Sequence, residues 1–280
     1  GDNPSTFLNE ERKFERERKG LNTNLGVEWY VNKTSSFTAS MVYRNSDNAS
    51  NTTNILDEIG SNNSITRNIR LDPEIEDDKT IQYSLNYDNQ FNGDSQHKLT
   101  FDFQYEKSEE SETSLINQNR IDVENVETRE KQDRILLQAD YVKPVGKEGQ
   151  FEMGYRGQFQ NLNSDFLVEN TNDNGDTFFI NTDLSNDLAF SQYVNAFYTQ
   201  YGNKLGDKFS YLFGIRLEGT RVTIDQETSG DFEKKNYTQL FPTANLAYEI
   251  SEDASITLGY NRRIRRPRSY FINPFPSRSS

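Results

Sequence analysis

Arginine is concentrated near the end of this sequence, where five arginines fall between Arg262 and Arg268. Each guanidinium group can donate two parallel hydrogen bonds to a carboxylate or a phosphate. The run can therefore bind an anionic ligand, or it can pair with carboxylates of its own chain and have a structural role alone. We favour the structural interpretation. The candidates for contact with a ligand are Arg262, Arg263, Arg265 and Arg266.

Residues that could support acid–base or metal chemistry are few. The chain has no cysteine and a single histidine, His97, which lies in a predicted turn. Neither a nucleophile–base pair nor a zinc site of cysteine and histidine ligands is therefore expected. The segment Asn170–Asp176 is rich in oxygen atoms, but it lacks the aspartate and the glutamate that begin and end a calcium loop. We predict no enzyme activity, no catalytic residue, no bound metal and no cofactor.

The composition favours a sheet that is apolar on one face only. Of the 280 residues, 32% are hydrophobic, which is too few for a thick core, yet 12% are aromatic, which argues against disorder. The net charge is −13, so nucleic acid is not an expected partner. No apolar run approaches the ~20 residues of a transmembrane helix, whereas a membrane-spanning β-strand needs only about 9–11 residues and can alternate in polarity.

Hydrophobic and polar residues alternate with a period of two along much of the chain, which is the pattern of a strand with two unlike faces. The clearest case is Leu240–Ile250 followed, after a short turn, by Ile256–Tyr260. Comparable segments are Leu21–Val31, Phe37–Tyr43, Ile81–Tyr87, Leu99–Tyr105, Ile135–Tyr141, Phe151–Phe159, Phe190–Tyr201 and Tyr211–Leu217. We predict about ten strands in five hairpins. Phe190–Tyr201 carries aromatic residues on both faces, so its orientation stays open.

The predicted connections alternate between short and long. Short turns fall near residues 32–35, 90–96, 143–149, 202–207 and 251–254, and long polar loops are expected at Asn45–Lys79, Glu106–Gln132, Asn161–Leu188 and Asp225–Asn236. Outer-membrane barrels have short periplasmic turns and long external loops. The prediction is an all-β, antiparallel up-and-down meander of about ten amphipathic strands, part of a larger transmembrane β-barrel. A soluble β-sheet or solenoid is the alternative.

Carboxylates on the polar face of the strands need no catalytic role. In a polar lumen we expect them to be solvated or paired with neighbouring cations such as Arg156 and Arg216. The acidic pairs Asp77-Asp78 and Glu109-Glu110 fall in predicted loops, where they would promote solubility.

The predicted sidedness places both ends of the sequence outside the cell. The charged residues 1–20 would form a loop or the exposed end of a strand, and Arg265–Ser280 would begin another external loop. Since a complete bacterial barrel normally starts and ends in the periplasm, we expect residues 1–280 to be a single, partial β-barrel region, with a plug domain and further strands elsewhere in the protein. A barrel closed by these strands alone is the alternative.

Roughly the final third of the sequence resembles the outer-membrane β-barrel family related to TonB-dependent receptors, of the type abundant in Bacteroidetes. Its Tyr-x-Arg-Arg-Ile-x-Arg-Pro motif is matched at Tyr260–Pro267, and an Asn-Pro-Phe sequence follows at Asn273–Phe275. Segments such as Phe213–Glu218 are also similar to the family. The motif residues for which the resemblance implies a structural role are Tyr260, Pro267, Asn273, Pro274 and Phe275.

The resemblance implies a function in ligand binding and uptake across the outer membrane. It also implies outer-membrane lipid as the surroundings, a plug domain and a TonB-type energy-coupling protein as partners, and room for a surface lipoprotein partner. The arginines named above could then contact lipopolysaccharide phosphates, the plug or an anionic ligand. The alternative is a surface-exposed β-sheet binding module or adhesin without transport.

Overall fold

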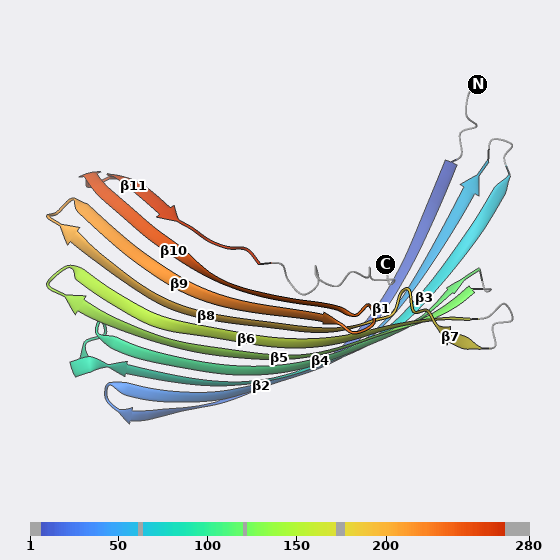
Figure 1. Ribbon diagram of the computed structural model, residues 1–280, viewed down its shortest axis with the longest axis horizontal. Helices are drawn as coiled ribbons and strands as arrows, with labels where there is room; N and C mark the ends of the chain where they lie inside the picture. Colours follow the sequence, from blue (N-terminus) through green and yellow to red (C-terminus); the bar gives the residue numbers. More distant parts are fainter. Residues whose placement is uncertain (1–6, 61–63, 120–121, 172–176, 267–280) are drawn as a thin grey trace, which may run out of the picture.

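The computed structural model describes residues 7–60, 64–119, 122–171 and 177–266 (Figure 1). They form one antiparallel sheet of eleven strands. The strands are β1 (Phe7–Asn32), β2 (Ser35–Ile59), β3 (Ile65–Gln90), β4 (Lys98–Gln118), β5 (Asp122–Val145), β6 (Gly149–Thr171), β7 (Phe178–Ile180), β8 (Asn186–Leu205), β9 (Phe209–Gln226), β10 (Asp231–Ser251) and β11 (Ala254–Asn261). Within the described residues, no helix is long and apolar enough to cross a membrane.

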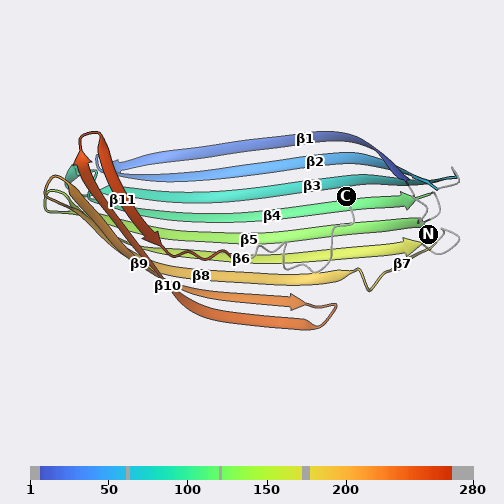
Figure 2. The ribbon, with the colours of Figure 1, turned by 90° about the horizontal axis from the view of Figure 1, so that it is seen from above.

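The strands follow one another in sequence order across the sheet, with only the short β7 off this path, where it pairs with β6. The predicted all-β, up-and-down meander is therefore confirmed, as are the five short turns. The sheet curves into a trough with a concave and a convex face, and residues 262–266, which follow β11, lie on the concave side (Figures 1 and 2).

The segments predicted as long polar loops are in fact strands. β2 and β3 pair without interruption from Ser35–Asn89 to Ile59–Ile65, which covers most of the expected loop Asn45–Lys79. The other three expected loops are likewise largely paired strand, and β9 and β10 are joined by a short turn at residues 227–230. Backbone pairing does not require an apolar face, so strands continue where hydrophobic alternation has ended. We call these polar strand ends the polar arms: residues 7–20, 44–59, 65–80, 106–118, 122–134, 160–171, 220–226 and 231–239.

The convex face carries a belt of exposed apolar side chains. Directly opposite residues share a face of a sheet, and Tyr155, Phe197, Leu217 and Leu240 are opposite one another across β6, β8, β9 and β10. Phe101 of β4, which is 42% exposed, lies on the same face. We call these outward-facing residues of the strands, from Trp29 on β1 to Leu258 on β11, the apolar belt.

The pairing also fixes the orientation that the sequence left open. On β8, Tyr193, Phe197 and Tyr201 face outward with the apolar belt, whereas Val194 and Tyr198 face the concave side.

Buried apolar side chains gather in the polar arms, on the concave side of β4, β5 and β6. Ile116, Val126, Phe166 and Val168 form this small core, and Leu184 packs against it. The residues just before β8 are held over it, because the Ser185 hydroxyl accepts a hydrogen bond from the Val168 amide at 3.0 Å. The tight packing of this connection therefore depends on side chains that the strands place inward.

His97 lies in the turn between β3 and β4, as predicted, but it is not a free surface residue. Its ring stacks at 4.5 Å from the Phe91 ring, and Nε2 lies 2.9 Å from the Tyr141 hydroxyl. The turn begins with Asn92 and Gly93, whose positive φ angles of 55° and 74° suit an Asn-Gly pair. These contacts give His97 a role in closing the turn.

Candidate functional site on the concave face

The concave face is polar opposite the apolar belt, because every second residue of each strand points inward. Its centre is formed by β4, β5, β6, β8 and β9. Glutamine and arginine dominate there: Gln104, Gln138, Arg156, Gln158, Gln192 and Arg216. Such side chains bind ligands through hydrogen bonds and charge, and they supply no nucleophile for covalent chemistry.

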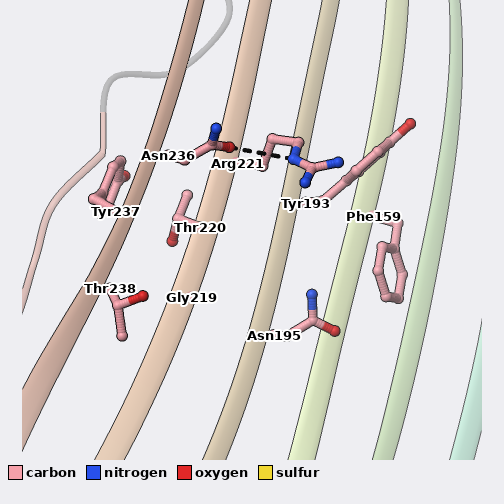
Figure 3. A pocket seen from close by; sticks show the side chains of 9 residues that line it. All are labelled: Phe159, Tyr193, Asn195, Gly219, Thr220, Arg221, Asn236, Tyr237 and Thr238. Carbon is pink, nitrogen blue, oxygen red and sulfur yellow. Dashed lines mark hydrogen bonds between the residues drawn. The ribbon is translucent and has the colours of Figure 1, made fainter.

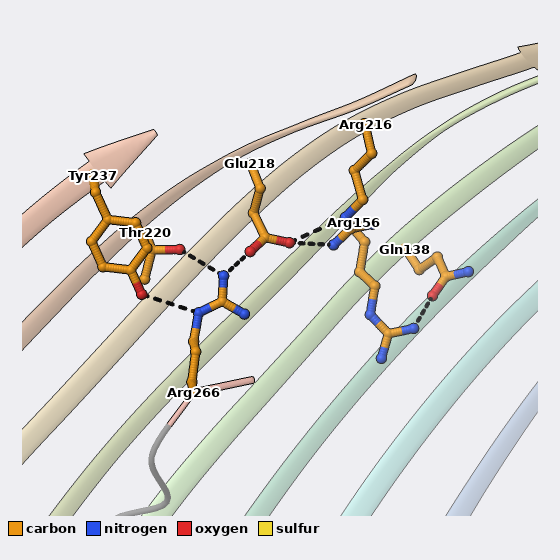
Figure 4. A network of polar contacts seen from close by, with 7 residues as sticks. All are labelled: Gln138, Arg156, Arg216, Glu218, Thr220, Tyr237 and Arg266. Atoms are coloured by element: carbon orange, nitrogen blue, oxygen red, sulfur yellow. Dashed lines mark hydrogen bonds and ion pairs between the residues drawn. The ribbon is translucent and has the colours of Figure 1, made fainter. Parts of the chain in front are cut away.

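Glu218 of β9 is the most buried charged residue of this face, with 5% of its surface exposed. Arg216 donates to its Oε2 from Nε at 3.1 Å and from Nη2 at 2.8 Å. Arg266 forms an ion pair with its Oε1 and donates to the hydroxyls of Thr220 and Tyr237 at 3.1 and 3.2 Å (Figure 4). Two cations thus hold one buried carboxylate. We call Arg216, Glu218, Thr220, Tyr237 and Arg266 the Glu218 network.

The four candidate arginines do not form one cluster. Arg266 folds back into the Glu218 network, while the Arg262 guanidinium lies 5.9 Å above the ring of Phe241. Arg263 and Arg265 are exposed. The pairing of Arg266 with an inward carboxylate fastens the segment after β11 to β9 and β10.

The motif residues are only partly within the described structure. Tyr260 lies on the apolar belt and is exposed. Pro267, Asn273, Pro274 and Phe275 lie outside the described residues, as do most of the calcium-like segment's central positions.

A hollow of about 420 Å³ opens in the polar wall beside the Glu218 network. Its lining includes Gln104, Gln158, Gln160, Gln192, Arg134, Arg156 and Arg266. Arg134 is paired with Glu106 at 3.3 Å. Arg156 donates to the amide oxygen of Gln138 at 3.0 Å, and within the described part of the chain it forms no ion pair. The predicted carboxylate partner is therefore found for Arg216 but not for Arg156. We call this hollow the amide pocket.

A second charged feature of the concave face lies in the polar arms. Asp78 of β3, Glu110 of β4 and Glu130 of β5 are directly opposite one another. Carboxylate oxygens of Glu76, Asp78 and Glu110 lie within 4.8 Å of each other. The prediction that Asp78 and Glu110 sit in loops is wrong, because these segments are paired strands. The sequence contained a signal for this arrangement. Carboxylates occur at every second position, at Glu74, Glu76 and Asp78, which places them on one face of a strand.

This crowding changes the acidity of Glu110. Desolvation by its neighbours, and then repulsion from Asp78 and Glu130, raise its pKa from 4.5 to about 7. Between these two values the folded state binds more protons than the unfolded state, so stability falls as pH rises through this window.

Replacing Glu110 with glutamine should therefore stabilise the protein at pH 8 and leave it unchanged at pH 4. The expected gain is on the order of 1 kcal/mol, because the side chain is exposed and water screens the repulsion. Denaturant unfolding in lipid vesicles at both pH values measures it. Glu109→Gln is the matched control: Glu109 faces the other way and pairs with Lys107 at 2.8 Å, so it should give no gain at pH 8. A gain from Glu109→Gln equal to that from Glu110→Gln would contradict this explanation.

The chain was compared with solved structures, with curated proteins and with models of protein families. Solved structures similar to the chain include the ferric citrate transporter FecA, with a TM-score of 0.46, 13% identity, and coverage of 86% of this chain and 43% of that one. The ferric yersiniabactin uptake receptor FyuA from Yersinia pestis has a TM-score of 0.48 and 11% identity, covering 90% and 46%. The ferric-catecholate import receptor Fiu from E. coli K12 has a TM-score of 0.46 and 7% identity, covering 93% and 54%. The chain thus spans about half the length of these proteins.

No curated protein matches the sequence. The model of the outer membrane protein beta-barrel family matches residues 89–280, which is more than half of the chain. This match extends well beyond the arginine motif and includes both the Glu218 network and the amide pocket. The chain belongs to the outer membrane protein beta-barrel family, and its place in the cell is the outer membrane.

Proposed function

We propose that the protein binds a ligand and takes it up across the outer membrane, as part of a barrel like those of TonB-dependent receptors. The observation that carries this proposal is the amide pocket, a polar hollow in a concave wall whose opposite face is an apolar belt. A barrel with lipid on the outside and a polar lumen has this arrangement. Four of the side chains that line the pocket are glutamines, which can both donate and accept hydrogen bonds.

The partners follow from the same proposal. The described sheet is open between β1 and β11, so further strands of the same protein would close the barrel and a plug domain would occupy its lumen. A TonB-type protein would supply the energy, and a surface lipoprotein could deliver ligand to the polar arms. Arg263 and Arg265 are exposed and available for a ligand or for lipopolysaccharide, whereas Arg266 is engaged by Glu218. The proposal includes no enzyme activity.

Uptake can be tested before the ligand is known. Cells that carry or lack the intact gene are grown in the same complex medium, and mass spectrometry follows which compounds leave the medium and enter the cells. We expect at least one compound to be internalised only by cells with the gene, and only while the proton-motive force is intact. Internalisation that continues unchanged after an uncoupler is added would contradict energised uptake.

Binding without transport is the second candidate, favoured by the length of the polar arms, which offer a large surface beyond the apolar belt. It predicts a different result in the same experiment. A compound would accumulate on the cell surface of gene-carrying cells, would not enter them, and would be retained after the uncoupler is added.

A further inference from the structure

The convex face has a second hollow, at the boundary between the apolar belt and the polar arms. It has a volume of about 660 Å³ and is bordered by Phe159, Tyr193, Asn195, Gly219 and Arg221, among others (Figure 3). These residues are on β6, β8 and β9, on the same face as the apolar belt. The hollow therefore opens toward the membrane and not toward the lumen.

Gly219 lies in the open part of the hollow. A Cβ atom at this position would meet no atom within 4 Å. On β9, the neighbours of Gly219 on the same face are Leu217 and Arg221, so the hollow has an apolar side toward the belt and a cationic side toward the arms. Tyr193, opposite Arg221, packs against Phe159 with the two rings tilted and their centroids 5.8 Å apart. Aromatic residues at the boundary between an apolar belt and polar strand ends are typical of the membrane interface.

Two cations lie near the hollow, on the side of the polar arms: Arg221 borders it, and Lys234 lies beyond its lining on the same face, opposite Thr223. Arg221 is exposed and donates from Nε to Asn236 Oδ1 at 3.2 Å, and among the described residues its two Nη groups form no hydrogen bond. Lys234 lies two residues from Asn236 on the same face of β10 and is exposed. Neither forms an ion pair with any carboxylate in the described residues.

The lack of a carboxylate partner is unexpected in this chain. Acidic residues outnumber basic ones by 44 to 31, and a comparable outward cation, Lys107 just beyond the belt on β4, pairs with Glu109 at 2.8 Å. A pair of cations kept free beside an apolar hollow is complementary to a molecule with a negative head and an apolar body.

We propose that Arg221 and Lys234 bind the phosphate of a membrane lipid headgroup, with part of the lipid's apolar body in the hollow beside Leu217. The two Nη groups of Arg221 would receive two phosphate oxygens in the paired geometry that guanidinium favours, and Lys234 would add a second positive charge. The predicted sidedness, with the polar arms outside the cell, assigns the lipid to the outer leaflet. This site is separate from the amide pocket and does not depend on which ligand the lumen takes.

The test measures the dissociation constant of diphosphoryl lipid A for the full-length protein in detergent micelles. The double variant Arg221→Gln/Lys234→Gln should bind the lipid about tenfold more weakly or worse. The control variant Lys107→Gln, which removes an ion-paired outward cation, should bind within about twofold of the wild type. Lipid A without its phosphates should bind the wild type as weakly as intact lipid A binds the double variant.

Two further measurements are needed. One distinguishes a loss of charge from a loss of folding, and the other distinguishes binding of the lipid from binding of free phosphate. Arg221→Lys/Lys234→Arg keeps both charges at exposed positions and should restore most of the affinity, which shows that a loss in the glutamine variant is not misfolding. Inorganic phosphate should not displace the lipid. The proposal is overturned if the glutamine double variant binds lipid A as tightly as the wild type, or if inorganic phosphate alone displaces it.

Discussion

Replacing Glu218 with alanine should lower the free energy of unfolding by about 3–5 kcal/mol, the usual cost of removing one partner from a buried ion pair. Glu218 is 5% exposed and accepts from both Arg216 and Arg266. Without it, two guanidinium groups remain close together in a partly desolvated place with no counter-charge. The expected loss is therefore the cost of two unpaired cations, and it is larger than the energy of a single hydrogen bond.

Denaturant unfolding in lipid vesicles measures this effect, with Glu249→Ala as the matched control. Glu249 also faces the concave side and pairs with Lys204 at 3.3 Å, but its side chain is 53% exposed. Exposed pairs contribute about 0–1 kcal/mol, so Glu249→Ala should have little effect. An equal loss in the two variants would show that burial of Glu218 is not the cause.

A double-mutant cycle identifies the part of the effect that belongs to Arg266. Combining Glu218→Ala with Arg266→Ala removes the carboxylate together with one of the two cations that would otherwise lack a counter-charge. The double variant should be more stable than the sum of the single losses by about 1–3 kcal/mol. Strict additivity would mean that the segment after β11 is held by the Thr220 and Tyr237 hydroxyls alone.

The membrane-facing part of each strand could be predicted from the sequence, and the polar arms could not. Leu99, Phe101 and Phe103 alternate with polar residues because lipid favours apolar side chains on one face and the lumen favours polar side chains on the other. From Lys107 to Ser114 both faces of β4 carry polar residues, so hydrophobic alternation disappears although the strand continues. Hydrophobic alternation appears only where the two faces of a strand have different surroundings. It therefore cannot identify a strand whose two faces are both polar.

The candidate site was predictable only where it depends on neighbours along one strand. Arg216 and Glu218 are two residues apart and share a face, so their pairing follows from the period of the strand. The return of Arg266 to Glu218 depends on how the chain folds after β11, for which the sequence has no periodic signal. The alignment of Asp78, Glu110 and Glu130 depends on the register of β3, β4 and β5 in the polar arms. The sequence could not predict this register, because these segments were not recognised as strands.

Replacing Phe101 with arginine tests the central claim, that the convex face contacts the lipid of the outer membrane. Phe101 lies within the apolar belt on β4 and is exposed. A charged residue on the lipid face of a barrel near the bilayer midplane costs about 2–4 kcal/mol. The free energy of unfolding in lipid vesicles should therefore fall by about 2–4 kcal/mol.

The decisive comparison is with Thr100→Arg, the adjacent position on the same strand. Thr100 faces the concave side and lies opposite Asp140 and Asp88, so an arginine there meets carboxylates and should change stability by about 1 kcal/mol or less. Measured in the same vesicles, the predicted result is a large loss for Phe101→Arg and a small change for Thr100→Arg. Equal losses, or a larger loss for Thr100→Arg, would contradict the assignment of the convex face to lipid and the concave face to a polar lumen.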